Sequence, residues 1–383
     1  MPTSFHSRSA LLHGTAMAAA CCFSPLAAAQ STVTVYGAVD VYAGRQSATG
    51  SSSRKEINSS LNPNALGFAG TESLGGGLVA GFVLEGQPAL DTGGTGQGGK
   101  FLGRQSNLYL QSDFGRVTIG RIHLAGRAFG IKYTATGWLT PDPLGNLAIA
   151  SGSAFAPVMN VDSVGSRVSN AVMYSSPRLG GFSFSLLQSA GERGPFSAGA
   201  AKLTQLGMGY GAGAFSVDFV YNRIPELAGN QVGQTDYAVG AQYAVSGVKL
   251  MASVFSHEGS SIAALGSTTP IPGSKGTDRT YLIGASYPTG PHTVGVSYGK
   301  LKVSDAHRGR RAANMSAPFS ALVDNTSGWS MAYSYALSKR TQLFAAYGAL
   351  DNGAQGTASI TPDLRPTAGG KSSLLASGIR HSF

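Results

Sequence analysis

Short and long connections alternate strictly along this chain, and that alternation restricts its fold more than any other feature. The short connections lie at about residues 75–76, 114–115, 179–180, 211–212, 246–247, 289–290 and 338–339. The long ones are rich in Ser, Gly, Pro and charge and cover about residues 45–62, 89–101, 122–166, 188–202, 223–235, 257–278, 302–327 and 351–372. Eight hairpins predict about sixteen antiparallel strands of ~10–13 residues, with turns at one end and loops at the other. This pattern is typical of a closed β-barrel, and sixteen strands leave a water-filled interior.

The segments between these connections alternate large apolar residues with small or polar ones. Phe215, Val217 and Phe219 alternate with Ser and Asp, and residues 182–186 and 329–337 repeat the pattern. Because successive side chains of a strand point to opposite faces, each segment has one apolar and one polar face. No segment beyond the leader has the ~18 consecutive apolar residues of a membrane-spanning helix. The pattern fits a barrel with lipid outside and water inside, or a sandwich of two sheets.

The first 29 residues are expected to be a cleaved signal peptide. Arg8 lies in a polar leader, an apolar stretch covers residues 10–23, and residues 27–29 are three alanines before the cleavage site at Gln30. The apolar stretch is too short and too broken to span ~30 Å of hydrocarbon. We therefore predict an exported chain whose residues 30–383 form one barrel domain.

Charge and cysteine content narrow the possible partners. Charged residues make up 12% of the chain and its net charge is +10, which falls to +9 (27 basic against 18 acidic residues) without the leader. Both cysteines, Cys21 and Cys22, lie in the leader, so the mature chain holds no disulfide. An exported basic protein is not expected to meet nucleic acid. A basic pore lining or contact with lipid phosphates fits the charge better.

Three short motifs resemble catalytic or cofactor sites, but each stands in the wrong context. Residues 295–299 have the spacing of a nucleophile elbow, which requires a strand–turn–helix corner, yet they lie inside an alternating segment. Residues 94–99 have the glycine spacing of a dinucleotide site without a βαβ unit around them. His257 lacks a second histidine four residues on. We expect no enzymatic activity, no cofactor and no metal.

The sequence resembles the trimeric general porins of Gram-negative bacteria, particularly the β-proteobacterial branch, over nearly the whole mature chain. The motifs that carry the resemblance lie at residues 31–40, 66–78, 103–105, 114–121, 167–177, 337–341 and 378–381. The resemblance implies an outer-membrane barrel of sixteen strands, a homotrimer, and passive diffusion of small hydrophilic solutes and ions. It also implies that the third long loop, at about 122–166, folds inward and constricts the pore opposite basic side chains.

The resemblance places pore arginines at Arg104, Arg121 and Arg167. With the loop's own charges, the predicted charge filter consists of Arg104, Arg121, Arg127, Lys132, Asp142 and Arg167. Ala65 and Ala69 stand where many relatives carry Arg or Lys, so we expect only a modest anion preference. An alternative role for Arg104 or Arg167 is to pair with loop carboxylates and hold the loop in place.

Arg121 poses a separate problem for simple alternation. It is in phase with Val117 and Ile119, which would turn its charge toward lipid at a high cost in free energy. We therefore expect a local break at the end of this strand that turns Arg121 inward.

Partner expectations come from the chain's last residue and from one basic loop. Phe383 ends the last predicted strand and is expected to be an assembly signal for the barrel-assembly machinery. The run at 307–311 is expected to be a solvated loop that touches lipopolysaccharide phosphates in the outer membrane. Two alternatives remain open: a substrate-specific channel of the same build, and a secreted β-rich adhesin or enzyme that is soluble without detergent.

Overall fold

The computed structural model describes residues 32–59, 63–136, 167–190, 202–225, 233–259, 275–309, 322, 324–361 and 364–383. The strands are β1 Thr32–Ala48, β2 Ser51–Ser59, β3 Ala65–Gly75, β4 Leu78–Gly86, β5 Gln105–Ser112, β6 Gly115–His123, β7 Arg167–Ser175, β8 Phe182–Ala190, β9 Lys202–Ala212, β10 Phe215–Ile224, β11 Gln234–Val245, β12 Val248–Gly259, β13 Gly276–Thr289, β14 His292–Lys302, β15 Thr326–Ala336, β16 Thr341–Asn352 and β17 Lys371–Ser382. The helical elements of the described residues are η1 Gln97–Gly99 and α1 Ala125–Lys132. The predicted signal peptide lies outside the described residues.

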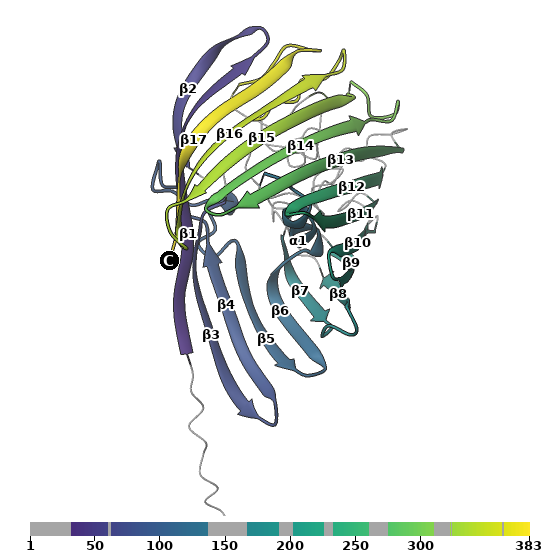
Figure 1. Cartoon of the computed structure of the whole chain (residues 1–383). Helices are drawn as coiled ribbons and strands as arrows, with labels where there is room; N and C mark the ends of the chain where they lie inside the picture. Colours follow the sequence, from purple (N-terminus) through teal and green to yellow (C-terminus); the bar gives the residue numbers. More distant parts are fainter. Residues whose placement is uncertain are drawn as a thin grey trace, which may run out of the picture.

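The antiparallel sheet closes on itself into a barrel (Figure 1). β1 pairs along one edge with β17, from Ala38 opposite Ser382 to Ala48 opposite Ser372. Along its other edge, the first part of β1 pairs with β3 and the second part with β2. Since β2 and β3 follow one another along the same edge, they occupy one position in the barrel. The seventeen segments therefore build the predicted sixteen-stranded barrel.

The connection expected at residues 45–62 is largely a β-hairpin. β1 continues to Ala48, the chain turns at Gly50 with a φ of 82°, and β2 returns from Ser51 to Ser59. β2 is polar on both faces, so the apolar alternation that predicts strands elsewhere is missing here. A hairpin that stands in water on both sides needs no apolar face, and its backbone hydrogen bonds still pair.

The barrel carries large apolar side chains outside and polar ones inside. On β12, Leu250 and Val254 are exposed on the outer surface, whereas Ser253 and His257 are buried on the inner face. The same outward exposure is found at Val35, Leu108, Ile119, Leu186, Val239, Ile283, Trp329, Met331 and Leu375. This distribution is the reverse of a soluble protein and is that of a barrel whose outer surface meets lipid. Within the described part of the chain, no helix has the length and hydropathy needed to cross a membrane.

The connection that follows β6 enters the barrel instead of continuing outward. α1 begins two residues after β6 and contacts β9 and β10, which are distant from β6 in strand order. Figure 1 shows the helix enclosed by the strands. The described start of the third long loop therefore folds inward, as the resemblance implies. Residues 137–166 of this loop, with Asp142, lie outside the described residues.

Candidate functional site: the barrel lumen

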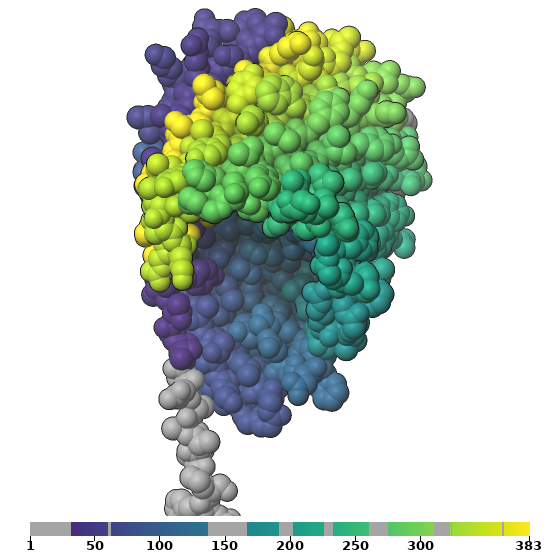
Figure 2. Space-filling model, viewed as in Figure 1, coloured from purple at the N-terminus to yellow at the C-terminus, as the bar shows by residue number. Residues whose placement is uncertain are grey.

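A hollow runs into the barrel between the β3–β6 side and the β12–β15 side (Figure 2). One cavity of 430 Å³ lies along β4–β7, and another of 540 Å³ lies between α1 and β7–β10. Both cavities are lined by His123, Met173 and Ser175. The two spaces therefore adjoin where β6 ends and the inward-folded loop begins.

α1 is attached to the inner faces of β9–β14, which we call the docking wall. The Phe129 ring lies 4.5 Å from the Tyr133 ring and 5.2 Å, edge-on, from the Phe255 ring, measured between centroids. The apolar cluster around them also contains Val220, Ala238, Met251 and Leu282. At the other end of the helix, the Ala125 amide donates to Gln205 Oε1 at 2.5 Å. A packed core thus holds the loop inside the barrel.

Glycines on the docking wall allow the loop to approach the strands closely. A Cβ atom on Gly240 would overlap the rings of Phe129 and Tyr133. A Cβ atom on Gly295 would overlap the carbonyl oxygen of Ala135. This close approach accounts for the glycine that opens the motif at 295–299, which lies within β14 and not at a strand–turn–helix corner.

Arg104 lies on the opposite part of the lumen wall in a buried ion pair. Its Nε is 2.5 Å from Glu85 Oε1, and the Tyr36 hydroxyl donates to Glu85 Oε2 at 2.9 Å. Glu85 belongs to β4 and not to the third loop. Arg104 is therefore held by a carboxylate of the barrel wall. The alternative that Arg104 or Arg167 pairs with loop carboxylates stays a prediction, because residues 137–166 lie outside the described residues.

Arg121 points inward because the strand is irregular beside it. The pairing of β6 with β7 shifts register between Gly120 and Ile122, and Gly120 has a φ of 133°. The Arg121 guanidinium donates to the Gly103 carbonyl at 2.6 Å and to Ser169 Oγ at 3.0 Å. The predicted local break is confirmed.

Arg127 and Arg167 complete the group of predicted arginines. Arg167 opens β7, has no exposed surface, and donates from Nη1 to Gln97 Oε1 at 3.3 Å. Arg127 lines the cavity beside α1. Both, together with Arg104 and Arg121, act electrostatically on His123. Four of the six predicted filter residues are therefore gathered around the end of β6.

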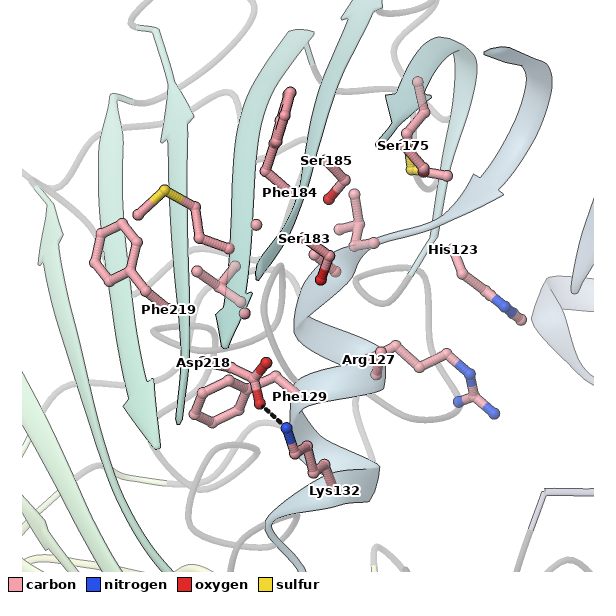
Figure 3. A pocket seen from close by; sticks show the side chains of 18 of the residues that line it. His123, Arg127, Phe129, Lys132, Ser175, Ser183, Phe184, Ser185, Asp218 and Phe219 are labelled. Atoms are coloured by element: carbon pink, nitrogen blue, oxygen red, sulfur yellow. Dashed lines mark hydrogen bonds and ion pairs between the residues drawn. The ribbon is translucent and has the colours of Figure 1, made fainter. Parts of the chain in front are cut away.

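Lys132 belongs to a different place. Its Nζ lies 2.5 Å from Asp218 Oδ2 on β10. In Figure 3, Lys132 points toward Asp218, whereas Arg127 and His123 project away from it. The structure thus separates Lys132 from the other predicted cations. The sixth predicted residue, Asp142, is not described.

The sequence reading missed one arginine of this wall. Arg380 Nη1 lies 3.3 Å from Asp40 Oδ2 where β17 closes against β1, and the charge of Arg104 acts on it. The sequence signals Arg380 only through its position in the strand. Ile379 beside it points outward, and Arg380 lies on the same face of the strand as the buried Ala376. We call the set Arg104, Arg121, Arg127, Arg167 and Arg380 the guanidinium cluster. Two carboxylates, Glu85 and Asp40, pair with it.

The docking wall has buried carboxylate–imidazole pairs where the opposite wall has arginine–carboxylate pairs. Asp236 Oδ1 lies 2.7 Å from His257 Nδ1, and Asp278 Oδ2 lies 2.8 Å from His307 Nδ1. All four side chains are fully buried. Among the described residues, no group of three or more His, Cys, Asp or Glu side chains is arranged to hold a metal.

The basic run at 307–311 is only partly solvated in its described residues, because His307 is buried whereas Arg308 is exposed. Its contact with lipopolysaccharide phosphates stays a prediction. His307 is buried against the barrel wall by Asp278. Arg308 forms ion pairs with Asp305 at 3.0 Å and Asp324 at 3.3 Å. Asp278 and Asp324 come from other strands and loops, so these contacts of His307 and Arg308 could not be read from the run itself. Residues 310 and 311 are outside the described part.

Phe383 is fastened to the first strand. Its amide donates to the Gly37 carbonyl at 3.0 Å, and the Gly37 amide donates to the Phe383 carbonyl at 3.1 Å. A Cβ atom on Gly37 would overlap the Phe383 ring, which is partly exposed on the outer surface. The terminal residue thus helps to close the barrel.

Comparison with known proteins identifies the family to which this barrel is similar. A profile described as Gram-negative porin matches residues 15–355. The chain is 27% identical to outer membrane porin protein 32 of Delftia acidovorans, over 94% of this chain and 96% of that protein. It is 26% identical to an outer membrane porin protein of Bordetella pertussis, over 94% of this chain and 97% of that protein. The fold matches an anion-selective porin from Comamonas acidovorans with a TM-score of 0.72 and 22% identity, over 92% of this chain and all of that one.

These relatives are channel proteins of the outer membrane and not enzymes, so the alternative of a secreted adhesin or enzyme is wrong. The closed barrel and its hollow lumen provide a passage for the passive diffusion of small hydrophilic solutes across the outer membrane. The family profile covers most of the sequence, and this chain belongs to the Gram-negative porin family.

Proposed function

We propose that this porin modestly prefers anions and that the guanidinium cluster is its charge filter. The observation that carries the proposal is the excess of positive charge at one side of the lumen: four guanidinium groups of the barrel wall and that of Arg127 on α1, against the carboxylates of Glu85 and Asp40. Fixed positive charge beside a narrow aqueous passage raises the local concentration of anions. Four of these arginines are less than a tenth exposed. They act through their field on passing ions more than through direct contact.

Small groups lie on the strand side of the cavity beside α1. The strands β7–β9 contribute small groups there: Ser175, Ser183, Ser185, Gly207 and Gly209. Short side chains leave room for hydrated solutes, and hydroxyl groups exchange hydrogen bonds with water at little cost. Solutes pass through the lumen between α1 and the guanidinium cluster without a chemical step, and the width left by the third loop sets the size limit.

The proposal extends to partners. A homotrimer is supported by an outward apolar hollow of 530 Å³ that includes Val33, Phe82 and Leu108, which a second copy would cover. A trimer form is named for the similar fold of OmpT from Vibrio cholerae, at a TM-score of 0.60. The mass of the purified protein after subtraction of detergent tests this: three chains are expected, and a monomer would exclude it.

Lipid and assembly partners follow from the outer surface. Lipopolysaccharide phosphates would meet the exposed cations at the loop ends of the strands, Lys202, Arg223, Arg279, Lys300 and Lys302. The barrel-assembly machinery would recognise the last strand with Phe383, and residues 1–29 would be removed on export. Deletion of Phe383 should lower the amount of folded barrel in the outer membrane while leaving export intact.

The test of the filter is single-channel current in a planar bilayer under a salt gradient. We expect ohmic current steps and a reversal potential whose sign shows that anions are more permeant than cations. A cation-side reversal potential at neutral pH would reject the filter while leaving the channel. Inhibition of ion current by one particular solute would favour the substrate-specific alternative.

A further inference from the structure

Asp218 is the one carboxylate among the described residues that line the cavity beside α1. The other charged or titratable side chains there are His123, Arg127 and Lys132. We propose that Asp218 is a specificity-determining residue of the channel. It neutralises the exposed charge of Lys132 and thereby limits the anion preference. The proposal deepens the proposed charge filter and rests on it only for the sign of the wild-type preference.

The strands make space for this carboxylate. Asp218 faces the lumen from β10, and its register partners are Gly209 on β9 and Gly240 on β11. A Cβ atom on Gly209 would overlap the Asp218 carboxylate. With glycine on both sides, the carboxylate can lean along the wall and meet the end of α1.

Two donors from the third loop converge on one oxygen of Asp218. Lys132 Nζ lies 2.5 Å from Oδ2, and the Tyr133 hydroxyl donates to the same oxygen at 2.7 Å. Burial, followed by the hydrogen bond to Asp218 and its negative charge, raises the pKa of the Tyr133 hydroxyl, so this group remains a donor. The carboxylate and the ammonium group are thus held together at a fixed position.

The docking of α1 does not depend on this ion pair. Phe129, Tyr133 and Phe255 bury their rings in the docking wall, and Ala125 is hydrogen-bonded to Gln205 at the start of the helix. A partly exposed ion pair adds little to such a core, because water screens it. The main consequence of Asp218 is therefore electrostatic.

Exposure decides which charge a solute meets. The Lys132 side chain is 35% exposed and that of Asp218 is 22% exposed, whereas Arg127, across the same cavity, is buried. Lys132 is therefore the most accessible cation beside α1 among the described residues. Because Asp218 is its partner, the pair presents no net charge to passing ions.

The experiment is a charge series read as reversal potential in planar bilayers with a gradient of KCl. Asp218→Asn keeps an acceptor for Tyr133 and should raise the chloride-to-potassium permeability ratio about sevenfold, because one unit charge about 7 Å from the ion path in water changes chloride and potassium about 2.7-fold each, in opposite directions. Lys132→Met should lower the ratio by a similar factor. The double variant should return close to wild type, with single-channel conductance little changed throughout.

Asp351→Asn is the matched control. Asp351 forms a comparable ion pair, 3.0 Å from Lys371, but on the outer surface of the barrel. Its reversal potential should equal that of wild type. The proposal is overturned if Asp218→Asn behaves like this control, or if its reversal potential moves only together with a large rise in conductance, which would indicate a displaced loop. A wild-type channel that prefers cations would reject the filter, and the difference between the two Asn variants would still decide the role of Asp218.

Discussion

The two sides of the lumen are built on different physical principles. The side from β17 through β1 to β7 carries four arginines of the guanidinium cluster, and the fifth, Arg127, comes from α1. The wall arginines are fixed by hydrogen bonds to groups such as Glu85 and the Gly103 carbonyl. The side from β9 to β14 carries an apolar core, wall glycines and the buried pairs of Asp236 with His257 and Asp278 with His307. Charge is concentrated where solutes are selected, and packing is concentrated where the loop is held.

This separation means that selectivity and pore width can change independently. A loop held by charge alone would loosen as salt rises, because salt screens ion pairs. A loop held by Phe129 and Tyr133 against an apolar wall is insensitive to salt. The channel can therefore keep one width over the range of ionic strength that an outer membrane meets, while its ion preference varies.

The largest effect should come from removing the aromatic anchor of the loop. Phe129→Ala deletes a buried ring that packs against Tyr133 and Phe255, a change that costs about 3–5 kcal/mol in packed cores. We expect α1 to leave the wall and the single-channel conductance to rise, with more frequent current fluctuations. Phe182→Ala, whose ring is 62% exposed on the outer surface, is the control and should conduct like wild type. An unchanged conductance in Phe129→Ala would show that the docking of α1 does not set the pore width.

A smaller effect on the same wall should follow from filling a glycine. Gly295→Val places a side chain where the Ala135 carbonyl lies, and overpacking of this kind costs about 1–3 kcal/mol. We expect the loop to shift by a short distance and the exclusion limit for uncharged sugars to change, as measured by liposome swelling. Val296→Ala on the outer face of β14 should leave that limit unaltered. Equal swelling rates for Gly295→Val and wild type would contradict close packing at this position.

The alternation of residues and of connection lengths predicts the barrel and its closure, because a strand's period fixes which face each residue occupies. The inward fold of the third loop is implied by the resemblance to porins and not by the alternation. It does not reveal depth along the barrel or which strands face one another across the lumen. Asp218 is visible as a polar position, yet its partner Lys132 lies 86 residues away. Arg380 was missed for the same reason, since Asp40 is 340 residues distant. Side-chain partners of this kind are set by closure of the whole barrel.

On the charged side, Arg380 tests whether the cluster extends beyond the residues that the family motifs suggest. Arg380→Gln removes one positive charge and leaves Asp40 without its partner arginine. The anion-to-cation permeability ratio should fall about four- to sevenfold, as expected when a unit charge about 7–10 Å from the ion path acts on anions and cations in opposite directions. Conductance should change little, because α1 is docked elsewhere. Arg178→Gln, at the exposed end of the barrel where the guanidinium meets the Gly211 carbonyl, should not move the reversal potential. Equal shifts of the reversal potential in both variants would mean that the net charge of the protein sets the ion preference, and that Arg380 is not part of a filter.

The smallest effect concerns pH and returns to the docking wall. The raised pKa of the docked Tyr133 hydroxyl means that it keeps its proton where a released tyrosine loses it. The free energy of docking is therefore independent of this group below about pH 10, the ordinary value for tyrosine, and falls by about 1.4 kcal/mol for each pH unit above it. We expect the current of the wild-type channel to become noisier between about pH 10 and 11 and to be steady from about pH 6 to 9. Tyr133→Phe should lose this alkaline response, whereas Tyr237→Phe on the outer surface should retain it. If Tyr133→Phe also becomes noisy above about pH 10, the ionising group lies elsewhere, and the hydrogen bond to Asp218 plays no part in holding the loop.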